Sequence, residues 1–163
     1  MIAPVVVDWA VVAPILPELL LIGVGVLLIG CDLFLPRQRQ LLPWLTVIGS
    51  LAGLIMVLGA QPAVTFGGMF LLDGYAMAFK VISLTAVIVI ALMSEQYCNV
   101  IGMRQGEYYS LLVFSLVGML LMASAGDLIV LYLGLELMAL PIYAMVGLHK
   151  REQRTSEAAI KYF

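Results

Sequence analysis

The sequence predicts an all-α protein that crosses a membrane several times, as a polytopic bundle of transmembrane helices. Two features of the composition carry this prediction: 64% of the 163 residues are hydrophobic, and only 11% are charged, against about 25% in soluble domains. A third observation is that each apolar run is long enough to cross a bilayer as one helix. Ten acidic and eight basic residues are too few to cover a soluble domain. The composition therefore excludes a soluble enzyme, a nucleic-acid-binding protein and a disordered tail.

Five apolar runs have the length of a full span, and a sixth begins near the end of the chain. They lack the alternation of apolar and polar residues that marks the strands of a membrane β-barrel. A helix that stopped inside the bilayer would leave backbone groups unsatisfied, so we expect the front part of a longer protein. The runs cover residues 18–35, 42–58, 74–94, 109–125 and 128–148, and the sixth starts near Ser156.

Proline, glycine and acidic residues mark the expected helix ends. Pro17 followed by Glu18 is typical of a helix start, and Pro36 is expected to end the first span. Asp127 is placed to cap the fifth span, and the two-residue turn at 126–127 predicts that the fourth and fifth spans are antiparallel neighbours. Gly49 and Gly53, four residues apart, would let another helix approach the second span closely.

The basic residues predict the orientation in the membrane. If each run crosses once, every Lys and Arg between the spans falls on one side, and the other side has none. Positively charged loops face the cytoplasm, so we expect the N-terminus outside. The six basic loop residues are Arg37, Arg39, Arg104, Lys150, Arg151 and Arg154.

Glu136 is the strongest candidate for a functional side chain. It lies eight residues into the fifth span, about 12 Å from the outer end, among apolar neighbours, and charges at that depth are costly enough to indicate function. Pro141 removes the N–H that would bond the Leu137 carbonyl, and should kink the helix there. A free carbonyl beside a buried acid favours water. The alternative is a structural glutamate paired with a basic group on another helix.

Two lysines inside spans are the remaining candidates. Lys161 lies about 8 Å into the sixth helix by its rise per residue, where it could join a proton relay with Glu136 or extend to the lipid headgroups. Lys80 follows Asp73 by two helical turns, and we expect it to extend outward toward that residue. The acidic residues near helix ends, Glu18 and Asp73 among them, are expected to be solvated or to cap helices.

Other kinds of site find no support in the sequence. It has no glycine-rich phosphate loop after a strand, no Cys/His cluster with metal-ligand spacing, and a single histidine, His149. Cys31 and Cys98 are too few for a disulfide framework and are expected to be small packing residues.

Several motifs resemble one family of membrane proteins. The stretch from Gly118 to Tyr143, with the core Gly134, Glu136 and Pro141, is similar to helices four and five of the antiporter-like subunits of respiratory complex I. The same core occurs in multisubunit sodium/proton antiporters. The ending Ser-Glu-Ala-Ala-Ile-Lys-Tyr-Phe (residues 156–163) and the opening Leu-Pro-Glu (residues 16–18) favour the subunit N family of the proton-translocating NADH–quinone oxidoreductases.

The resemblance implies a fold and a mechanism. Members of that family have about fourteen helices with two inverted five-helix repeats, so residues 1–108 would form an N-terminal three-helix region and 109–163 the start of the first repeat. Glu136 matches a glutamate thought to couple with lysines on helices absent from this sequence, and Lys161 matches a lysine of helix six. Lys80 matches no motif of the family that we can place.

The resemblance also implies where cofactors and partners lie. This chain is expected to bind no cofactor, with NAD, FMN, iron–sulfur clusters and quinone held elsewhere in the complex. The expected partners are the lipid bilayer and neighbouring subunits of the M and K types. The expected location is the bacterial inner membrane, or the mitochondrial inner or thylakoid membrane. The alternatives to a proton-pumping subunit are a subunit of a cation/proton antiporter and a purely structural membrane subunit.

Overall fold

A bundle of five long helices forms the body of the molecule in the computed structural model, which describes residues 9–34, 40–101 and 105–148. All five are long and apolar enough to cross a membrane, as predicted. Within the described ranges, the chain runs through α1 (Trp9–Val12), the 3-10 turn η1 (Ala13–Ile15), α2 (Leu16–Phe34), α3 (Leu41–Leu58), β1 (Ala63–Thr65), η2 (Phe66–Gly68), β2 (Phe70–Leu72), α4 (Gly74–Ile101), α5 (Gln105–Ala123) and α6 (Leu128–Val146).

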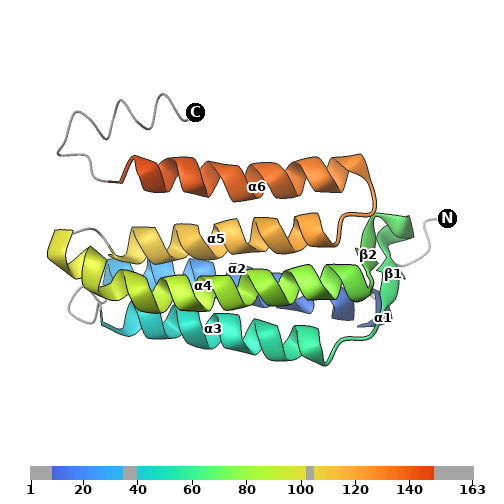
Figure 1. The fold of residues 1–163 in the computed structure, drawn as a ribbon, viewed down its shortest axis with the longest axis horizontal. Helices are drawn as coiled ribbons and strands as arrows, with labels where there is room; N and C mark the ends of the chain where they lie inside the picture. Colours follow the sequence, from blue (N-terminus) through green and yellow to red (C-terminus); the bar gives the residue numbers. More distant parts are fainter. Residues whose placement is uncertain (1–8, 35–39, 102–104, 149–163) are drawn as a thin grey trace.

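The five long helices alternate in direction, so that α2, α4 and α6 begin at one end of the bundle and α3 and α5 begin at the other (Figure 1). We call the end at which α2, α4 and α6 begin the hairpin end, because β1 and β2 lie there. The ends of α2, α4 and α6 near the predicted basic loops lie together at the opposite end. This alternation is what single crossings of the membrane require.

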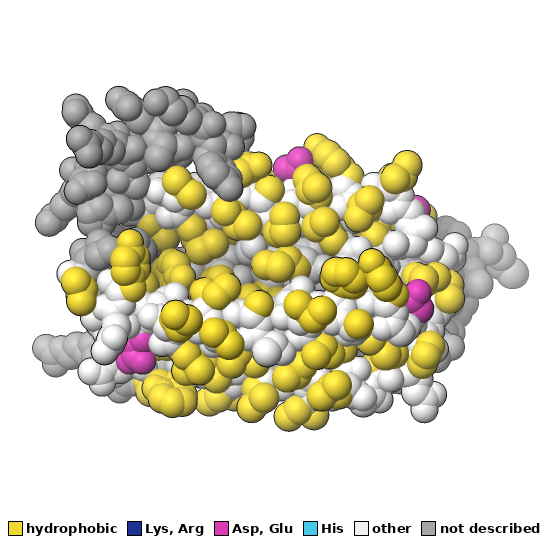
Figure 2. All heavy atoms as spheres, viewed as in Figure 1, with side chains coloured by type: hydrophobic (Ala, Val, Ile, Leu, Met, Phe, Trp, Pro, Cys, Tyr) yellow, Lys and Arg dark blue, Asp and Glu magenta, His cyan; other side chains and the backbone are white. Residues whose placement is uncertain are grey.

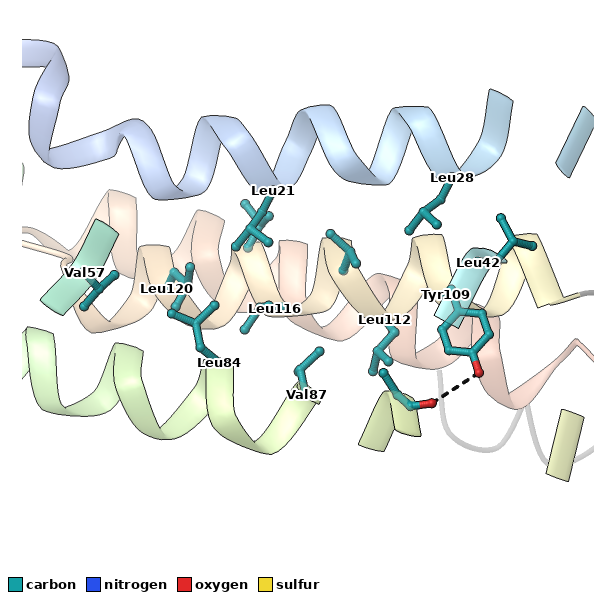
Figure 3. Packing of buried hydrophobic residues seen from close by; sticks show 13 residues of the cluster. Leu21, Leu28, Leu42, Val57, Leu84, Val87, Tyr109, Leu112, Leu116 and Leu120 are labelled. Atoms are coloured by element: carbon teal, nitrogen blue, oxygen red, sulfur yellow. Dashed lines mark hydrogen bonds between the residues drawn. The ribbon is translucent and has the colours of Figure 1, made fainter. Parts of the chain in front are cut away.

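Helix α5 forms the centre of the bundle, packing against α2, α4 and α6. Its most apolar stretch is 56% buried, against 17% for α6. The core is built from leucine and valine side chains of α2 to α5 (Figure 3). Tyr109 lies at 0% exposure in this core and donates its hydroxyl hydrogen bond to the Ala91 carbonyl at 3.3 Å, so that its buried polar group is satisfied.

The expected close approach at Gly49 and Gly53 is confirmed. A side-chain β-carbon at Gly49 would lie 2.8 Å from a methyl group of Val24 on α2, and one at Gly53 would touch Leu84 of α4 at 3.4 Å. Residues this small let helix backbones pack closely where the hydrophobic effect adds little. The two glycines therefore seat α3 against both α2 and α4.

A short β-hairpin occupies the connection between α3 and α4, where the sequence predicted only a loop. Its strands pair antiparallel, with Ala63 opposite Leu72 and Thr65 opposite Phe70. The connecting residues Phe66, Gly67 and Gly68 all have positive φ, at 51°, 65° and 94°, a region that glycine enters without steric cost. The hairpin is the feature that joins the helices at this end of the bundle.

The predicted division at residues 108 and 109 falls inside α5. Because α5 packs on helices from both sides of that division, the described residues share one core. The two-region organisation stays a prediction.

Candidate functional site

The site is built on α6, which starts at the helix cap that the sequence predicted. Asp127 has an extended backbone (φ −141°, ψ 169°), and its Oδ1 accepts a hydrogen bond from the Val130 N–H at 2.8 Å. An acidic side chain at this position satisfies one of the free N–H groups of the first turn and also favours the positive end of the helix dipole. The predicted tight turn and the antiparallel packing of α5 and α6 are thereby confirmed.

Helices α5 and α6 approach each other through backbone at two glycines. A β-carbon at Gly134 would lie 2.8 Å from Cγ of Met122 and 2.9 Å from its backbone nitrogen. A β-carbon at Gly118 would overlap the α6 backbone at Met138. There is no room for a side chain at either position, so this contact fixes where α6 sits on α5.

Glu136 lies two residues after Gly134 and eight after Leu128, the first residue of α6. The rise of an α-helix places it about 12 Å from the hairpin end of α6. Its side chain is half-buried, and the Tyr132 phenol, one turn earlier on the same helix, interacts with its carboxylate. The helix continues through Pro141 to Val146, and the kink expected at this proline stays a prediction.

The surroundings of Glu136 are apolar. Most side chains of α6 are hydrophobic, and many are exposed, including Leu133 at 57% and Leu140 at 50%. Figure 2 shows hydrophobic side chains spread over the face formed by α4, α5 and α6, with acidic side chains only as separate points. An ionisable group on such a helix faces the interior of a larger bundle or a watered cavity, or else it pairs with another residue.

Lys161 and His149 lie outside the described residues, so the proposed relation between Lys161 and Glu136 stays a prediction. Within residues 9–34, 40–101 and 105–148, no group of three or more His, Cys, Asp or Glu side chains could hold a metal ion.

A second ionisable site lies in the first three spans, and here two predictions are wrong. Lys80 does not reach toward Asp73: its Nζ donates to Oε1 of Glu18 at 2.5 Å, and both side chains are buried, at 0% and 1% exposure. Glu18 is therefore neither solvated nor a helix cap. Asp73 instead caps α4, accepting a hydrogen bond from the Ala76 N–H at 2.7 Å.

The physical reason is the face of α4 that carries Lys80. That face packs into the bundle, where an unpaired ammonium is costly, and Glu18 stands two residues after the start of α2 at a similar depth. The ammonium also lies 4.8 Å from the centre of the Phe70 ring, close enough for a cation–π contact. Local spacing could not find this pair, but two opposite charges near the same end of two spans were a usable signal.

Comparison with known proteins agrees with the motifs. Residues 125–163 match the family described as the NADH:quinone oxidoreductase/Mrp antiporter transmembrane domain. NADH-quinone oxidoreductase subunit N of Desulfovibrio desulfuricans is 53% identical, with 98% of this chain and 32% of the relative covered. Subunit N 2 of Rhizobium meliloti is 38% identical (99% and 34% covered), and subunit N of Dehalococcoides mccartyi is 41% identical (90% and 31%).

The chain thus spans about a third of the length of the curated relatives it matches. Similarity over nearly the whole chain, the matching domain at its end and five membrane-crossing helices lead to one assignment. The chain belongs to the subunit N family of NADH-quinone oxidoreductases, as a match to the N-terminal third of its members.

Proposed function

We propose that this chain is part of a proton-translocating membrane subunit of an NADH–quinone oxidoreductase, and that Glu136 is one of the groups that take up and release the translocated proton. The observation that supports this most strongly is the position of Glu136. It is a half-buried carboxylate about 12 Å along a transmembrane helix, beyond easy reach of either membrane surface.

The packing of α6 supports the same proposal. The close contact at Gly118 and Gly134 holds α6 firmly two residues before Glu136, as a proton-transferring group requires if its distance to the next group is to be fixed. The Tyr132 phenol beside the carboxylate offers a hydroxyl that can donate to the charged form. Carboxylates of this kind, inside spans, are typical of proton relays in pumps.

The rest of the assignment follows from the family and is part of the proposal. The relay would continue through Lys161 and through lysines in the remaining part of the protein. The NAD, FMN, iron–sulfur and quinone sites would lie in other subunits, and this chain would contact neighbouring membrane subunits of the M and K types. The protein would lie in a bacterial inner membrane, with its N-terminus and the hairpin end outside.

The test compares Glu136→Gln with Glu95→Gln in the full-length subunit, assembled in its complex in membrane vesicles. Glu95 is a partly exposed carboxylate near the far end of α4, so the same chemical change there serves as a matched control. We expect Glu136→Gln to lower the proton uptake that accompanies NADH oxidation, and Glu95→Gln to leave it near the wild-type level. Normal pumping by an assembled Glu136→Gln complex would contradict the proposal.

A cation/proton antiporter subunit is the second candidate, because the matching domain is shared with Mrp antiporters. The relatives named above are all subunits of NADH-quinone oxidoreductases, which favours the first proposal. Sodium-driven proton movement without NADH, lost in Glu136→Gln, would favour the antiporter.

A further inference from the structure

We propose that the buried pair Glu18–Lys80 positions Glu136, acting through the β-hairpin that holds the start of α6. Glu18 and Lys80 would be positioning residues, and the proposal rests on the proposed function of Glu136.

The ion pair contacts the β-hairpin through Lys80. Lys80 is held by Glu18 at 2.5 Å on one side and lies 4.8 Å from the centre of the Phe70 ring on the other. Phe70 is 2% exposed and forms a small buried cluster with Leu72 and Ala76. In a buried site, a cation over an aromatic face is worth more than at the surface. The charge of Lys80 therefore binds β2 to both α2 and α4.

The hairpin in turn is hydrogen-bonded to the turn between α5 and α6. Leu71 N donates to the Ser124 carbonyl, and Gly126 N donates to the Met69 carbonyl, both at 2.8 Å. Together with the isolated antiparallel bridge between Phe70 and Ala125, these bonds hold the turn against β2. The residue after this turn segment is Asp127, the cap of α6.

Helix α6 is held in place at two points. Among the described helices it packs mainly on α5, and it is the least buried span. The contact at Gly118 and Gly134 holds its middle, and the hairpin holds its start. If the hairpin loosens, α6 is free to turn about the glycine contact, and Glu136, two residues beyond that contact, changes direction.

The ion pair is a sensitive place for this control because it is incompletely satisfied. The second oxygen of Glu18, Oε2, is buried and has no hydrogen-bond partner among the described residues. Loss of the Lys80 charge would leave the whole carboxylate unpaired, and it would then take up a proton or draw water into the site. Either change, together with loss of the cation over Phe70, would disturb the packing of β2 against α2 and α4.

The experiment uses the full-length subunit in the assembled complex and compares Lys80→Met with Lys80→Arg. Ile82→Met on the same helix is the control, because Ile82 is 62% exposed and contributes nothing to the contacts above. Two quantities are measured: amide hydrogen exchange in the segment 124–130, and protons moved per NADH oxidised. The double variant Glu18→Gln/Lys80→Met carries the same test without a buried unpaired charge, in case Lys80→Met does not assemble.

We expect Lys80→Met and the double variant to raise exchange at the turn roughly thirtyfold, the factor for loss of a desolvated cation–π contact, and to lower the proton-to-NADH ratio. Lys80→Arg and Ile82→Met should resemble the wild type. Unchanged exchange, or faster exchange with an unchanged ratio, overturns the positioning role. Glu136→Gln is measured in parallel: normal pumping by that variant contradicts the proposed function, and the positioning role falls with it. Loss of pumping in Glu136→Gln beside wild-type behaviour of Lys80→Met overturns the positioning role alone.

Discussion

Lys80 of α4 donates a hydrogen bond to Glu18 of α2 at 2.5 Å, and both side chains are buried although 62 residues separate them in the chain. The pair joins the first and third spans near the hairpin end. Buried ion pairs contribute little net stability, but breaking one leaves a charge that nothing compensates. This asymmetry leads to the first prediction.

Lys80→Met should destabilise the subunit by about 3–5 kcal/mol, the usual cost of removing one partner of a buried ion pair and leaving the other charge unpaired. Glu18→Gln/Lys80→Met should lose much less, because no charge remains buried. The free energies of unfolding of Glu18→Gln, Lys80→Met and the double variant are measured in detergent micelles. Together with the wild type, they form a double-mutant cycle. Additive losses would show that the two side chains do not interact.

Gly118→Val should separate α5 from α6 and cost about 1–3 kcal/mol, as overfilling of a packed interface does, because a β-carbon there would overlap the α6 backbone. Gly23→Val is the matched control, since nothing lies within 4 Å of a β-carbon at Gly23. Thermal unfolding of the two variants checks this. Equal midpoints would mean that the close approach of α5 and α6 is not needed.

Asp127→Ala should loosen the first turn of α6, at a cost of about 1 kcal/mol for a lost N-terminal cap. Asp127→Asn keeps the side-chain oxygen that accepts from Val130 N–H and should cost less. Hydrogen exchange at the Val130 amide reports on this bond directly. Identical exchange in the alanine and asparagine variants would show that the cap does not hold the turn.

The five spans were predictable because each is a long apolar run, and the starts of α6 and α4 were marked by capping residues. Helix α4 runs on to Ile101, past the predicted end at residue 94, because Ser94 bonds back to the Ile90 carbonyl at 2.7 Å and to the Tyr108 hydroxyl at 2.8 Å. A polar residue whose hydroxyl is satisfied in this way does not have to end a helix.

The hairpin could not be predicted, because its strands have only three residues each. Such strands are too short for a pattern of alternating side chains, and the α5–α6 turn that bonds to Met69 and Leu71 is distant in the sequence. The opposite charges of Glu18 and Lys80 near the same end of two spans were a signal for a pair, but local spacing could not establish it. The pairing depends on which faces of α2 and α4 meet in the bundle.

Within the candidate site, the depth of Glu136 followed directly from its distance to the turn at 126–127. The glycine contact beside it did not, because Gly118 and Gly134 lie on different helices and have no common spacing. Only the packed bundle shows that their backbones meet.

The most direct test of the proposed function is the number of protons moved per NADH oxidised by the assembled complex that carries Glu136→Gln. Removal of a proton-transferring group costs at least roughly 100-fold in the step it serves, so the route through Glu136 effectively stops and we predict a ratio below that of the wild type, with Glu136→Asp partly restoring it. A wild-type ratio in Glu136→Gln would contradict the role of Glu136 in proton translocation.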